Sequence, residues 1–264
     1  SLTVALIGCD GMTVQGMRIE LAPGSGRLIA SDGDGIHCQN NRVGPHVEDC
    51  LFEGLGDDAI NIYATPMIVR EVIDDSHVVI DGVTPRVGDR VQVLEPQRGI
   101  IRDQPQVAAV DGMKITFASP VADIAAGDTL YNQSACGAGF VIRNNRMRNH
   151  RRNGALLRGG DGVVEGNTFE NAGGFGVYAG NEPGWPEGPA PWNLIVRDNT
   201  FIGGGKPQGY GGGAAIVMHG AGIGRAAEGR ILHDLRITNN RFTDPPGAMD
   251  ISITSAEHVV IENN

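Results

Sequence analysis

The chain has 264 residues, which is long enough for one large hydrophobic core or two smaller ones. Its formal net charge of −10 argues against nucleic acid or an anionic membrane as the main partner. No run of consecutive apolar residues approaches the length of about 18 residues that would predict a membrane span. Glycine is abundant, at 40 residues, whereas aromatic residues make up only 5% of the chain. This composition is typical of many short aliphatic strands joined by tight turns.

A short motif recurs along the chain and predicts the fold. Each copy has apolar residues near its start, a small residue or asparagine in fifth place and an apolar residue in seventh place. The fifth positions are Met17, Cys50, Asn145, Asn167, Asn199, Asn240 and Asn264. The shortest spacings, 22 residues (145 to 167) and 24 residues (240 to 264), set the basic period, and the others are one period plus an insertion. Such a period with two or three short strands is typical of a right-handed parallel β-helix, whose coils stack about 4.8 Å apart.

Two further features fit stacked coils. We expect the repeated asparagine to adopt the left-handed backbone of a coil corner and to hydrogen-bond to the next asparagine along a ladder. A second strand is predicted about ten residues after each marker, at residues 35–39, 59–63, 155–158, 176–180, 214–218 and 250–254. Because the chain begins as a strand and stops within the motif, we expect it to be a piece of a longer protein.

The repeat is interrupted between its second and third copies. Residues 66–134 lack the asparagine motif and show alternating apolar residues, with Asp81–Gly82 and Asp111–Gly112 as candidate hairpin turns. This pattern predicts a small antiparallel β-barrel or sandwich. The expected organisation is therefore all-β: a parallel β-helix over 1–65, an inserted β-barrel over 66–134 and a second part of the β-helix over 135–264.

Three carboxylates stand beside glycines near the starts of predicted strands: Asp34, Asp57 and Asp58. In the expected register Asp34 and Asp57 are equivalent positions of neighbouring coils, so all three should lie close together. For both members of the Asp pair to face outward, Gly56 must supply a turn or bulge. Carboxyl groups this close cannot all ionise freely, so at least one pKa should rise. Carboxyl groups with different pKa values are what glycoside hydrolysis requires.

Other interpretations of these residues remain open. An Asp-Gly pair at a corner is often only a turn, and the run DGDG also suggests a calcium loop. The remaining ligands of an EF-hand are absent, however, so no metal site is predicted. The cysteines lack zinc-ligand spacing and are expected to be buried free thiols. They are Cys9, Cys38, Cys50 and Cys136.

Several polar and aromatic residues are candidates for binding a substrate beside the carboxylates. His37 follows Asp34 by three residues and could face either the site or the core, and Asn61 and Tyr63 alternate after the Asp pair. Asn61 could likewise face the site, or it could belong to a ladder of side chains in the core.

The next coils add further candidates on the same side. Arg152 is expected opposite the Asp pair and Arg158 opposite the end of that strand, where they could bind sugar hydroxyls or simply be solvated. In the loop that follows, Trp185 could stack on a pyranose and Glu182 could bond its hydroxyls, although a lone tryptophan is often a packing anchor. His219 is aligned with the same edge.

The residues around the carboxylates resemble a known family. An Asp followed one coil later by Gly-Asp-Asp is similar to the inverting polygalacturonase-type glycosidases, but their Gly-His-Gly and Arg-Ile-Lys motifs are absent, which argues against a uronate substrate. The run DGIHCQNNRVGPHVEDCLFEGLGDDAINIY (34–63) more closely resembles the bacterial α-1,3-galactosidases active on blood-group-B-type glycans. Those enzymes also carry a β-barrel inserted in a β-helix. The later run WPEGPAPWNLIVRDNTF (185–201) is similar to that family too.

The resemblance implies roles for the three acids. Asp57 would be the general acid, while Asp34 and Asp58 would hold and deprotonate the attacking water; from the residues alone, either Asp57 or Asp58 could be the acid. It further implies an exo-acting enzyme that releases terminal α-linked galactose with inversion, requires no cofactor and is periplasmic or secreted.

Three alternatives to this activity are compatible with the fold that the sequence predicts. The chain could be another β-helix glycosidase, acting on a plant or algal polysaccharide, or a non-catalytic β-helix that only binds carbohydrate. A polysaccharide lyase is disfavoured, because lyases of this architecture rely on calcium or on basic residues and the candidate edge is acidic.

Overall fold

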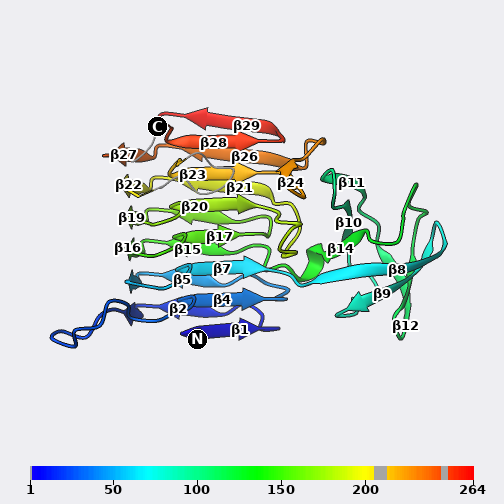
Figure 1. Cartoon of the computed structure of the whole chain (residues 1–264), viewed down its shortest axis with the longest axis horizontal. Coiled ribbons are helices and arrows are strands. Elements are labelled where there is room, and N and C mark those ends of the chain that lie inside the picture. Colours follow the sequence, from blue (N-terminus) through cyan, green and yellow to red (C-terminus); the bar gives the residue numbers. More distant parts are fainter. Residues whose placement is uncertain (1, 205–212, 245–248) are drawn as a thin grey trace.

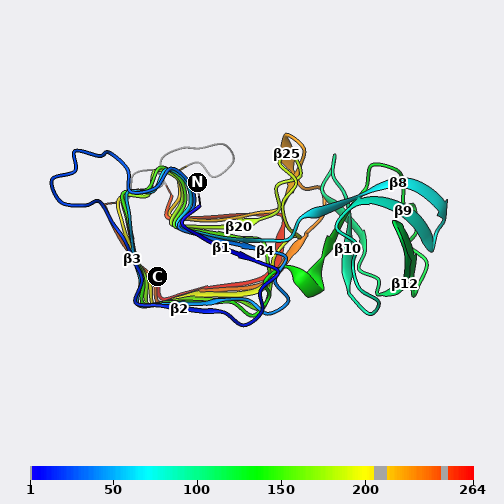
Figure 2. The same ribbon diagram turned by 90° about the horizontal axis from the view of Figure 1, so that it is seen from below.

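The computed structural model describes residues 2–204, 213–244 and 249–264. Over these residues the chain is wound into a stack of coils, with the N-terminus at one end of the stack and the C-terminus at the other (Figure 1). Viewed along the stack, the coils superimpose and a second body projects from one side (Figure 2). None of the helices in the described ranges has the length and apolar character needed to cross a bilayer.

Three parallel sheets run along the described part of the stack, and each coil contributes one strand to each sheet, except that the last coil contributes only to the first two. Sheet 1 consists of β1 (Val4–Ile7), β4 (Ile36–Gln39), β7 (Ile60–Tyr63), β17 (Ala155–Leu157), β20 (Val177–Gly180), β23 (Ile216–His219) and β28 (Ile251–Thr254). Sheet 2 consists of β2 (Thr13–Gln15), β5 (His46–Glu48), β15 (Val141–Arg143), β18 (Val163–Glu165), β21 (Trp192–Arg197), β26 (Leu232–Thr238) and β29 (Ala256–Glu262). Sheet 3 consists of β3 (Arg18–Ile19), β6 (Leu51–Glu53), β16 (Arg146–Arg148), β19 (Thr168–Glu170), β22 (Thr200–Ile202) and β27 (Arg241–Thr243). A short hairpin, β24 (Ala221–Gly222) and β25 (Arg225–Ala226), follows β23.

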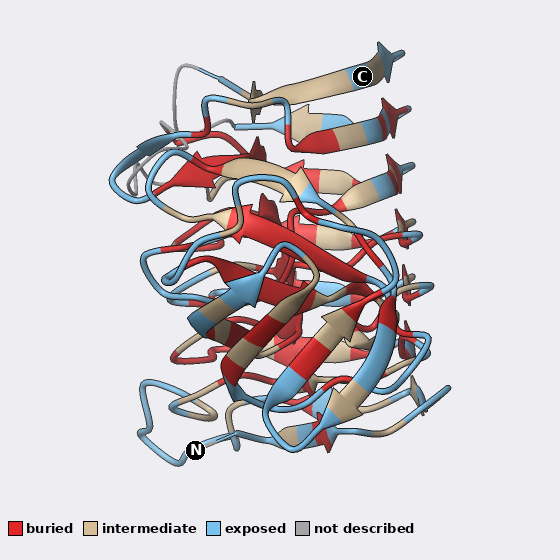
Figure 3. Cartoon of the chain, turned by 90° about the vertical axis from the view of Figure 1, so that its right-hand side faces the viewer, coloured by how far each residue is buried: buried red, intermediate tan, exposed pale blue. Residues whose placement is uncertain are grey.

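The core of the stack is formed by columns of equivalent apolar residues. Parallel pairing without slippage places each inward side chain on its counterpart in the next coil. Phe169, Phe201 and Phe242 are stacked in this way, with ring centroids 4.9 and 5.2 Å apart. Buried residues accordingly concentrate along the strands, where they alternate with exposed and intermediate residues (Figure 3). Because burial of each such side chain contributes about 2 kcal/mol, the columns strongly favour this register.

A ladder of asparagines runs along the corner between sheets 2 and 3. Asn167 Oδ1 accepts hydrogen bonds from the backbone and side-chain amides of Asn145, at 2.9 and 3.0 Å. The same pair of bonds joins Asn167 to Asn199, Asn199 to Asn240, and Asn240 to Asn264. The predicted ladder is therefore present.

The prediction that these asparagines themselves adopt left-handed backbone is wrong. The left-handed residue is the one immediately before each ladder position, and these residues are Gly16, Asp49, Asn144, Gly166, Asp198, Asn239 and Asn263. Glycine, asparagine and aspartate tolerate this conformation. The sharp turn at that residue directs the next side chain inward, where it reaches its counterpart in the neighbouring coil.

Residues between β7 and β15 leave the stack and form an antiparallel sheet. In this fully described segment the strand order is β11-β10-β14-β8-β9-β13-β12. The strands are β8 (Pro66–Asp74), β9 (His77–Gly82), β10 (Val91–Glu95), β11 (Ile100–Asp103), β12 (Val107–Asp111), β13 (Lys114–Phe117) and β14 (Thr129–Asn132). A bridge between Arg90 and Gln106 joins the segment before β10 to the segment before β12, so the sheet curls back on itself around its own apolar core. A 3-10 turn at Gln133–Ala135 returns the chain to the stack.

Only one of the two predicted Asp-Gly hairpin turns is present. Asp111–Gly112 turns between β12 and β13, with Gly112 at a φ of 56°. Asp81–Gly82 instead forms the end of β9 and pairs with β8. The β8–β9 turn lies at Asp75–Ser76, because antiparallel pairing continues over the full length of β9.

The asparagine ladder generates a prediction about stability. Asn167→Ala removes a buried acceptor that serves two donors of Asn145, and each buried group left without a partner costs about 1–3 kcal/mol. The free energy of unfolding, measured by urea titration, should fall by at least about 2 kcal/mol. Thr168→Ala, a partly exposed control at the next position, should cost less than about 1 kcal/mol. Equal losses for the two variants would contradict a stabilising role for the ladder.

Candidate active site

The register of sheet 1 brings the three carboxylates together. Ile36 of β4 pairs with Ile60 of β7, which aligns Asp34 with Asp58 and not with Asp57 as the sequence spacing suggested. The backbone N–H of Asp58 donates to Asp34 Oδ1 at 3.3 Å. One oxygen from each of Asp34, Asp57 and Asp58 lies within 4.8 Å of the others. The one-residue difference arises because the offset between these coils is 24 residues (36 to 60), not 23.

Glycines shape the chain at this corner through close backbone contacts. A Cβ atom on Gly56 would lie 2.7 Å from the carbonyl oxygen of Asp32, so only glycine lets the two coils approach here. The chain bends at Gly56 and Asp57, and both Asp57 and Asp58 consequently line the same cavity. Gly35 is needed for the same reason, since its Cβ would lie 2.6 Å from the carbonyl oxygen of Ala59.

The carboxylates line a cavity of about 640 Å³ on the outer side of sheet 1. Its volume is within the range of about 300–1,000 Å³ that is usual for small-molecule sites. The polar lining, besides the carboxylates, comprises His37, Asn61, Arg152, Asn153, Arg158, Glu182 and Glu187. The apolar and aromatic lining comprises Leu2, Leu156, Phe175, Tyr178 and Trp185. An acidic group of this kind facing aromatic and amide side chains can bind and act on a polyhydroxylated ligand.

The two adjacent aspartates are in different environments. Asp58 is only 5% exposed, and its Oδ1 accepts bonds from the backbone and side-chain amides of Asn153 at 2.8 and 2.9 Å. Burial raises the Asp58 pKa to about 8, with further contributions from Asp34 and Asp57. The side chain of Asp57 is 49% exposed, and Arg152 Nε lies 3.9 Å from its Oδ1. Partial burial raises the Asp57 pKa, the nearby Asp34 carboxylate adds to this rise, and Arg152 opposes it.

Asp34 is held by a chain of side chains beneath the cavity. Its Oδ2 lies 2.7 Å from His37 Nδ1, and His37 Nε2 lies 3.1 Å from the Tyr63 hydroxyl. Gln39 Nε2 donates to the same hydroxyl at 2.6 Å, and burial raises the Tyr63 pKa to about 12, so the phenol remains neutral. One arrangement gives every bond a donor: Gln39 donates to Tyr63, Tyr63 to His37 Nε2, and His37 Nδ1–H to Asp34. Tyr63 is thus buried behind His37 and does not line the cavity.

The remaining predicted binding residues, Asn61, Arg158, Glu182 and Trp185, also line the cavity. Arg158 is 1% exposed and pairs with Glu187 at 2.7 Å and with Glu182 at 2.6 Å. Trp185 is 68% exposed, and its indole Nε1 donates to Glu187 Oε1 at 3.0 Å. Asn61 is buried, lines the cavity, and has an Oδ1 atom without a hydrogen-bond partner. A buried amide oxygen without a partner is costly, so a donor from a ligand would stabilise it.

Sequence reasoning missed three kinds of lining residue. Asn153 could have been found, since the 95-residue offset that aligns Asp57 with Arg152 also aligns Asp58 with Asn153. The side chains of Phe175 and Tyr178 carry no sequence signal that separates them from core aromatics, and Glu187 lies in a loop without periodicity. His219 is buried and does not line the cavity.

Two other kinds of chemistry, cation binding by the carboxylates and reactions of the cysteines, have less support. Within the described residues, Asp34, Asp57 and Asp58 form the group with oxygens near enough to share one cation, but Asp58 would first have to ionise against its raised pKa. The cysteines are free: Cys38, Cys50 and Cys136 are buried, and Cys9 is partly exposed.

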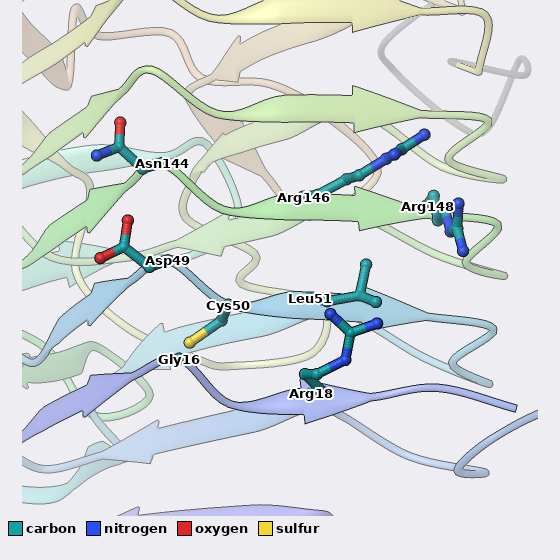
Figure 4. Close-up of a pocket in the computed structure, with 8 residues that line it drawn as sticks. All are labelled: Gly16, Arg18, Asp49, Cys50, Leu51, Asn144, Arg146 and Arg148. Carbon is teal, nitrogen blue, oxygen red and sulfur yellow. The ribbon is translucent and has the colours of Figure 1, made fainter. Parts of the chain in front are cut away.

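A second cavity, of about 350 Å³, lies at the corner between sheets 2 and 3 (Figure 4). Its arginines are already paired, in the couples Arg18–Glu20, Arg146–Glu170 and Arg148–Glu53. This surface is therefore explained by ion pairs, one within a coil and two between neighbouring coils.

A model of a protein family described as "Right handed beta helix region" matches residues 127–264. The chain belongs to this right-handed β-helix family. The predicted all-β, right-handed parallel β-helix is thereby confirmed.

The resemblance to bacterial α-1,3-galactosidases is also confirmed at the level of sequence. Alpha-1,3-galactosidase B of Akkermansia muciniphila is 33% identical over 206 residues, covering 72% of this chain and 26% of that protein. A protein of the same name from Phocaeicola vulgatus is 30% identical over 204 residues, covering 67% of this chain and 33% of that protein. The chain thus spans about a quarter to a third of the length of these relatives. Among solved structures, the tailspike protein gp49 of Pseudomonas phage LKA1 matches 98% of this chain and 46% of its own, with 13% identity and a TM-score of 0.33.

The environment of Asp58 predicts how stability depends on pH. In the folded chain the Asp58 carboxyl group has a pKa of about 8, whereas in the unfolded chain it loses its proton at about pH 4. Between these values the unfolded state binds fewer protons, so this group lowers the free energy of unfolding as pH rises, by at most about 1.4 kcal/mol per unit. Asp58→Asn keeps an acceptor for Asn153 and does not titrate.

The stability of Asp58→Asn relative to the unmodified chain should therefore increase steadily between about pH 5 and pH 8. Urea titrations at each pH measure this difference. Asp111→Asn, on the exposed β12–β13 hairpin, is the matched control and should show no such trend. A difference for Asp58→Asn that does not change with pH would show that Asp58 is not held neutral.

Proposed function

We propose that this chain carries the catalytic site of a glycoside hydrolase that releases terminal α-linked galactose from glycans. The observation that carries the proposal is the grouping of Asp34, Asp57 and Asp58 within 4.8 Å in a cavity of about 640 Å³. The similarity to proteins named alpha-1,3-galactosidase supports the galactoside. A periplasmic or secreted location belongs to the same proposal.

The environments of the carboxyl groups support distinct roles. Asp57 is the more exposed of the adjacent pair and has a raised pKa, so it can carry a proton to the glycosidic oxygen. Asp58 is buried and bonded to Asn153, which leaves it less able to reach a leaving group. These differences favour Asp57 as the general acid, the role that the resemblance implies for it.

The proposed reaction proceeds in one displacement. Asp57 gives its proton to the glycosidic oxygen as the bond to the anomeric carbon breaks. A water attacks that carbon and gives its proton to Asp34, which His37 orients through the 2.7 Å contact. Asp58, largely neutral below about pH 8, helps to hold the water, and Asn61 accepts a hydrogen bond from a sugar hydroxyl.

The spacing of the carboxylates bears on stereochemistry. Inverting enzymes usually separate the acid and the base by about 6.5–9.5 Å, and retaining enzymes by about 5 Å. The closest oxygens here lie within 4.8 Å, so the spacing alone does not favour inversion. Inversion in this proposal is supported by the family resemblance, and the anomer that forms first tests it directly.

Asp57→Asn should lower hydrolysis by at least about 100-fold while the fold is kept. Loss of a general acid lowers turnover by about 10²–10⁴-fold, because the leaving oxygen must depart unprotonated. The measurement is galactose release from an α-1,3-linked galactose disaccharide, with circular dichroism to check folding. Asp111→Asn serves as the control and should retain full activity. Unchanged turnover in Asp57→Asn would remove Asp57 from the mechanism.

Proton NMR of the first-formed sugar should show β-galactose released from an α-linked substrate. Appearance of α-galactose first would overturn inversion while leaving hydrolysis in place. The substrate panel should also contain polygalacturonate and an α-glucan. Turnover of these alone would favour a glycosidase of another polysaccharide, and binding without turnover on every substrate would favour a non-catalytic carbohydrate-binding β-helix.

A further inference from the structure

An exposed tryptophan stands at the cavity of the proposed active site. Several large apolar side chains of the described residues are exposed, and Trp185 is the single aromatic residue among them. Of its surface, 68% is accessible. It lines the same cavity as the three carboxylates, together with Leu156, Phe175 and Tyr178. A large indole left in water is unfavourable unless a ligand covers it, and the face of a pyranose ring is apolar enough to do so.

The indole is fixed before any ligand arrives. Its N–H donates to Glu187 Oε1, and Glu187 Oε2 pairs with Arg158 at 2.7 Å. Arg158 is 1% exposed and takes Glu182 as a second partner, so its guanidinium is held from two sides. Charge-assisted bonds to a buried arginine are among the strongest polar contacts in proteins. These contacts restrict the positions that the indole of Trp185 can adopt.

Two backbone contacts attach the loop that carries Trp185 to neighbouring parts of the chain. A Cβ atom on Gly188 would lie 2.2 Å from Arg158 Cβ, so only glycine, here at a φ of 65°, lets the loop pack on the arginine. The backbone N–H of Ala190 donates to Gln92 Oε1 in β10 at 2.9 Å. The loop is thus tied to a coil of the β-helix through Arg158 and to the inserted sheet through Gln92.

The charges of the cavity restrict which sugars fit. Asp57 and Asp58 carry protons in the proposed mechanism and add no negative charge. The remaining carboxylates of the lining, Asp34, Glu182 and Glu187, outnumber its two arginines, Arg152 and Arg158. A sugar that carries its own carboxylate would be repelled by this excess of negative charge. A neutral pyranose would meet no such repulsion.

We infer that Trp185 is a preset stacking platform for the apolar face of a neutral pyranose, positioned by Arg158 through Glu187. This inference rests on the proposed function for the identity of the sugar. Galactose suits the platform, because its axial 4-hydroxyl leaves the carbon–hydrogen bonds of positions 3, 4 and 5 on one continuous face. Arg158 acts on the sugar only through the loop and is a positioning residue.

The chain has two tryptophans, so fluorescence can report on Trp185 alone. In a Trp192→Phe background that also carries Asp57→Asn, turnover is expected to be at least about 100-fold slower and Trp185 is the single indole. Addition of an α-1,3-linked galactose disaccharide should shift the emission to shorter wavelength and protect it from acrylamide quenching, with saturation. The same titration with galacturonic acid should give a dissociation constant at least about tenfold weaker than that for free galactose.

Variants separate stacking from positioning. Trp185→Ala should weaken binding of the disaccharide by about tenfold in calorimetry, and Trp185→Phe should recover part of this loss. Glu187→Gln in the single-tryptophan background should make the unliganded indole easier to quench, because it removes the charge that ties the partner of the indole to Arg158. Glu182→Gln, which leaves the bond from the indole in place, is the matched control and should change the quenching less.

The outcomes distinguish this inference from the proposed function. Suppose that the unmodified chain hydrolyses galactosides, that the fluorescence of Trp185 does not respond to sugar, and that Trp185→Ala binds the disaccharide as tightly as before. These results would overturn the platform and leave the proposed function intact. A saturable response with no hydrolysis by the unmodified chain would support the platform and contradict the catalytic proposal. Equal binding of galactose and galacturonic acid would overturn the selection of neutral sugars.

Discussion

Stacking of coils in strict register is the constraint on which the rest of this structure depends. Parallel pairing holds each residue of one coil above its equivalent in the next. Stacking of the coils is therefore enough to make neighbours of residues that are far apart in sequence. The columns of phenylalanine inside the stack and the arginine–glutamate pairs outside it follow from the same pairing. So does the meeting of Asp34 with Asp58, which the candidate active site requires.

The candidate catalytic carboxylates also act as parts of the scaffold. Asp58 N–H donates to Asp34 Oδ1, Asn153 N–H donates to Asp58 Oδ1, and Phe175 N–H donates to Asn153 Oδ1. This second ladder resembles the asparagine ladder between sheets 2 and 3, but its backbone donors point toward the preceding coil instead of the following one. One oxygen of Asp58 is thereby committed to structure, which keeps its carboxyl group at a fixed place and a buried depth. Asp57, which takes no part in these bonds, remains accessible to a ligand.

The inserted sheet has a structural connection to the cavity. Arg42 of the stack pairs with Asp89 at 2.8 Å, and Gln92 holds the loop that carries Trp185 through Ala190. The insertion therefore buttresses one wall of the cavity from the side, while the coils supply its floor. A strand repeat alone would leave a nearly flat outer surface, since every coil has the same outline, and such a surface would give a ligand little enclosure.

The sequence by itself determined the repeat, the β-helix, the asparagine ladder and the grouping of Asp34 with the Asp pair, because all of these depend on periodicity and parallel stacking preserves periodicity in space. It also pointed to His37, Asn61, Arg158, Glu182 and Trp185 as neighbours of the carboxylates. Whether a residue one position from a corner faces in or out depends on local bends, and the tertiary structure alone decided these: it aligned Asp34 with Asp58 and buried Tyr63 behind His37. The pairing of Arg158 with Glu187 was equally out of reach, because loop residues follow no period and their partners are chosen by packing in three dimensions.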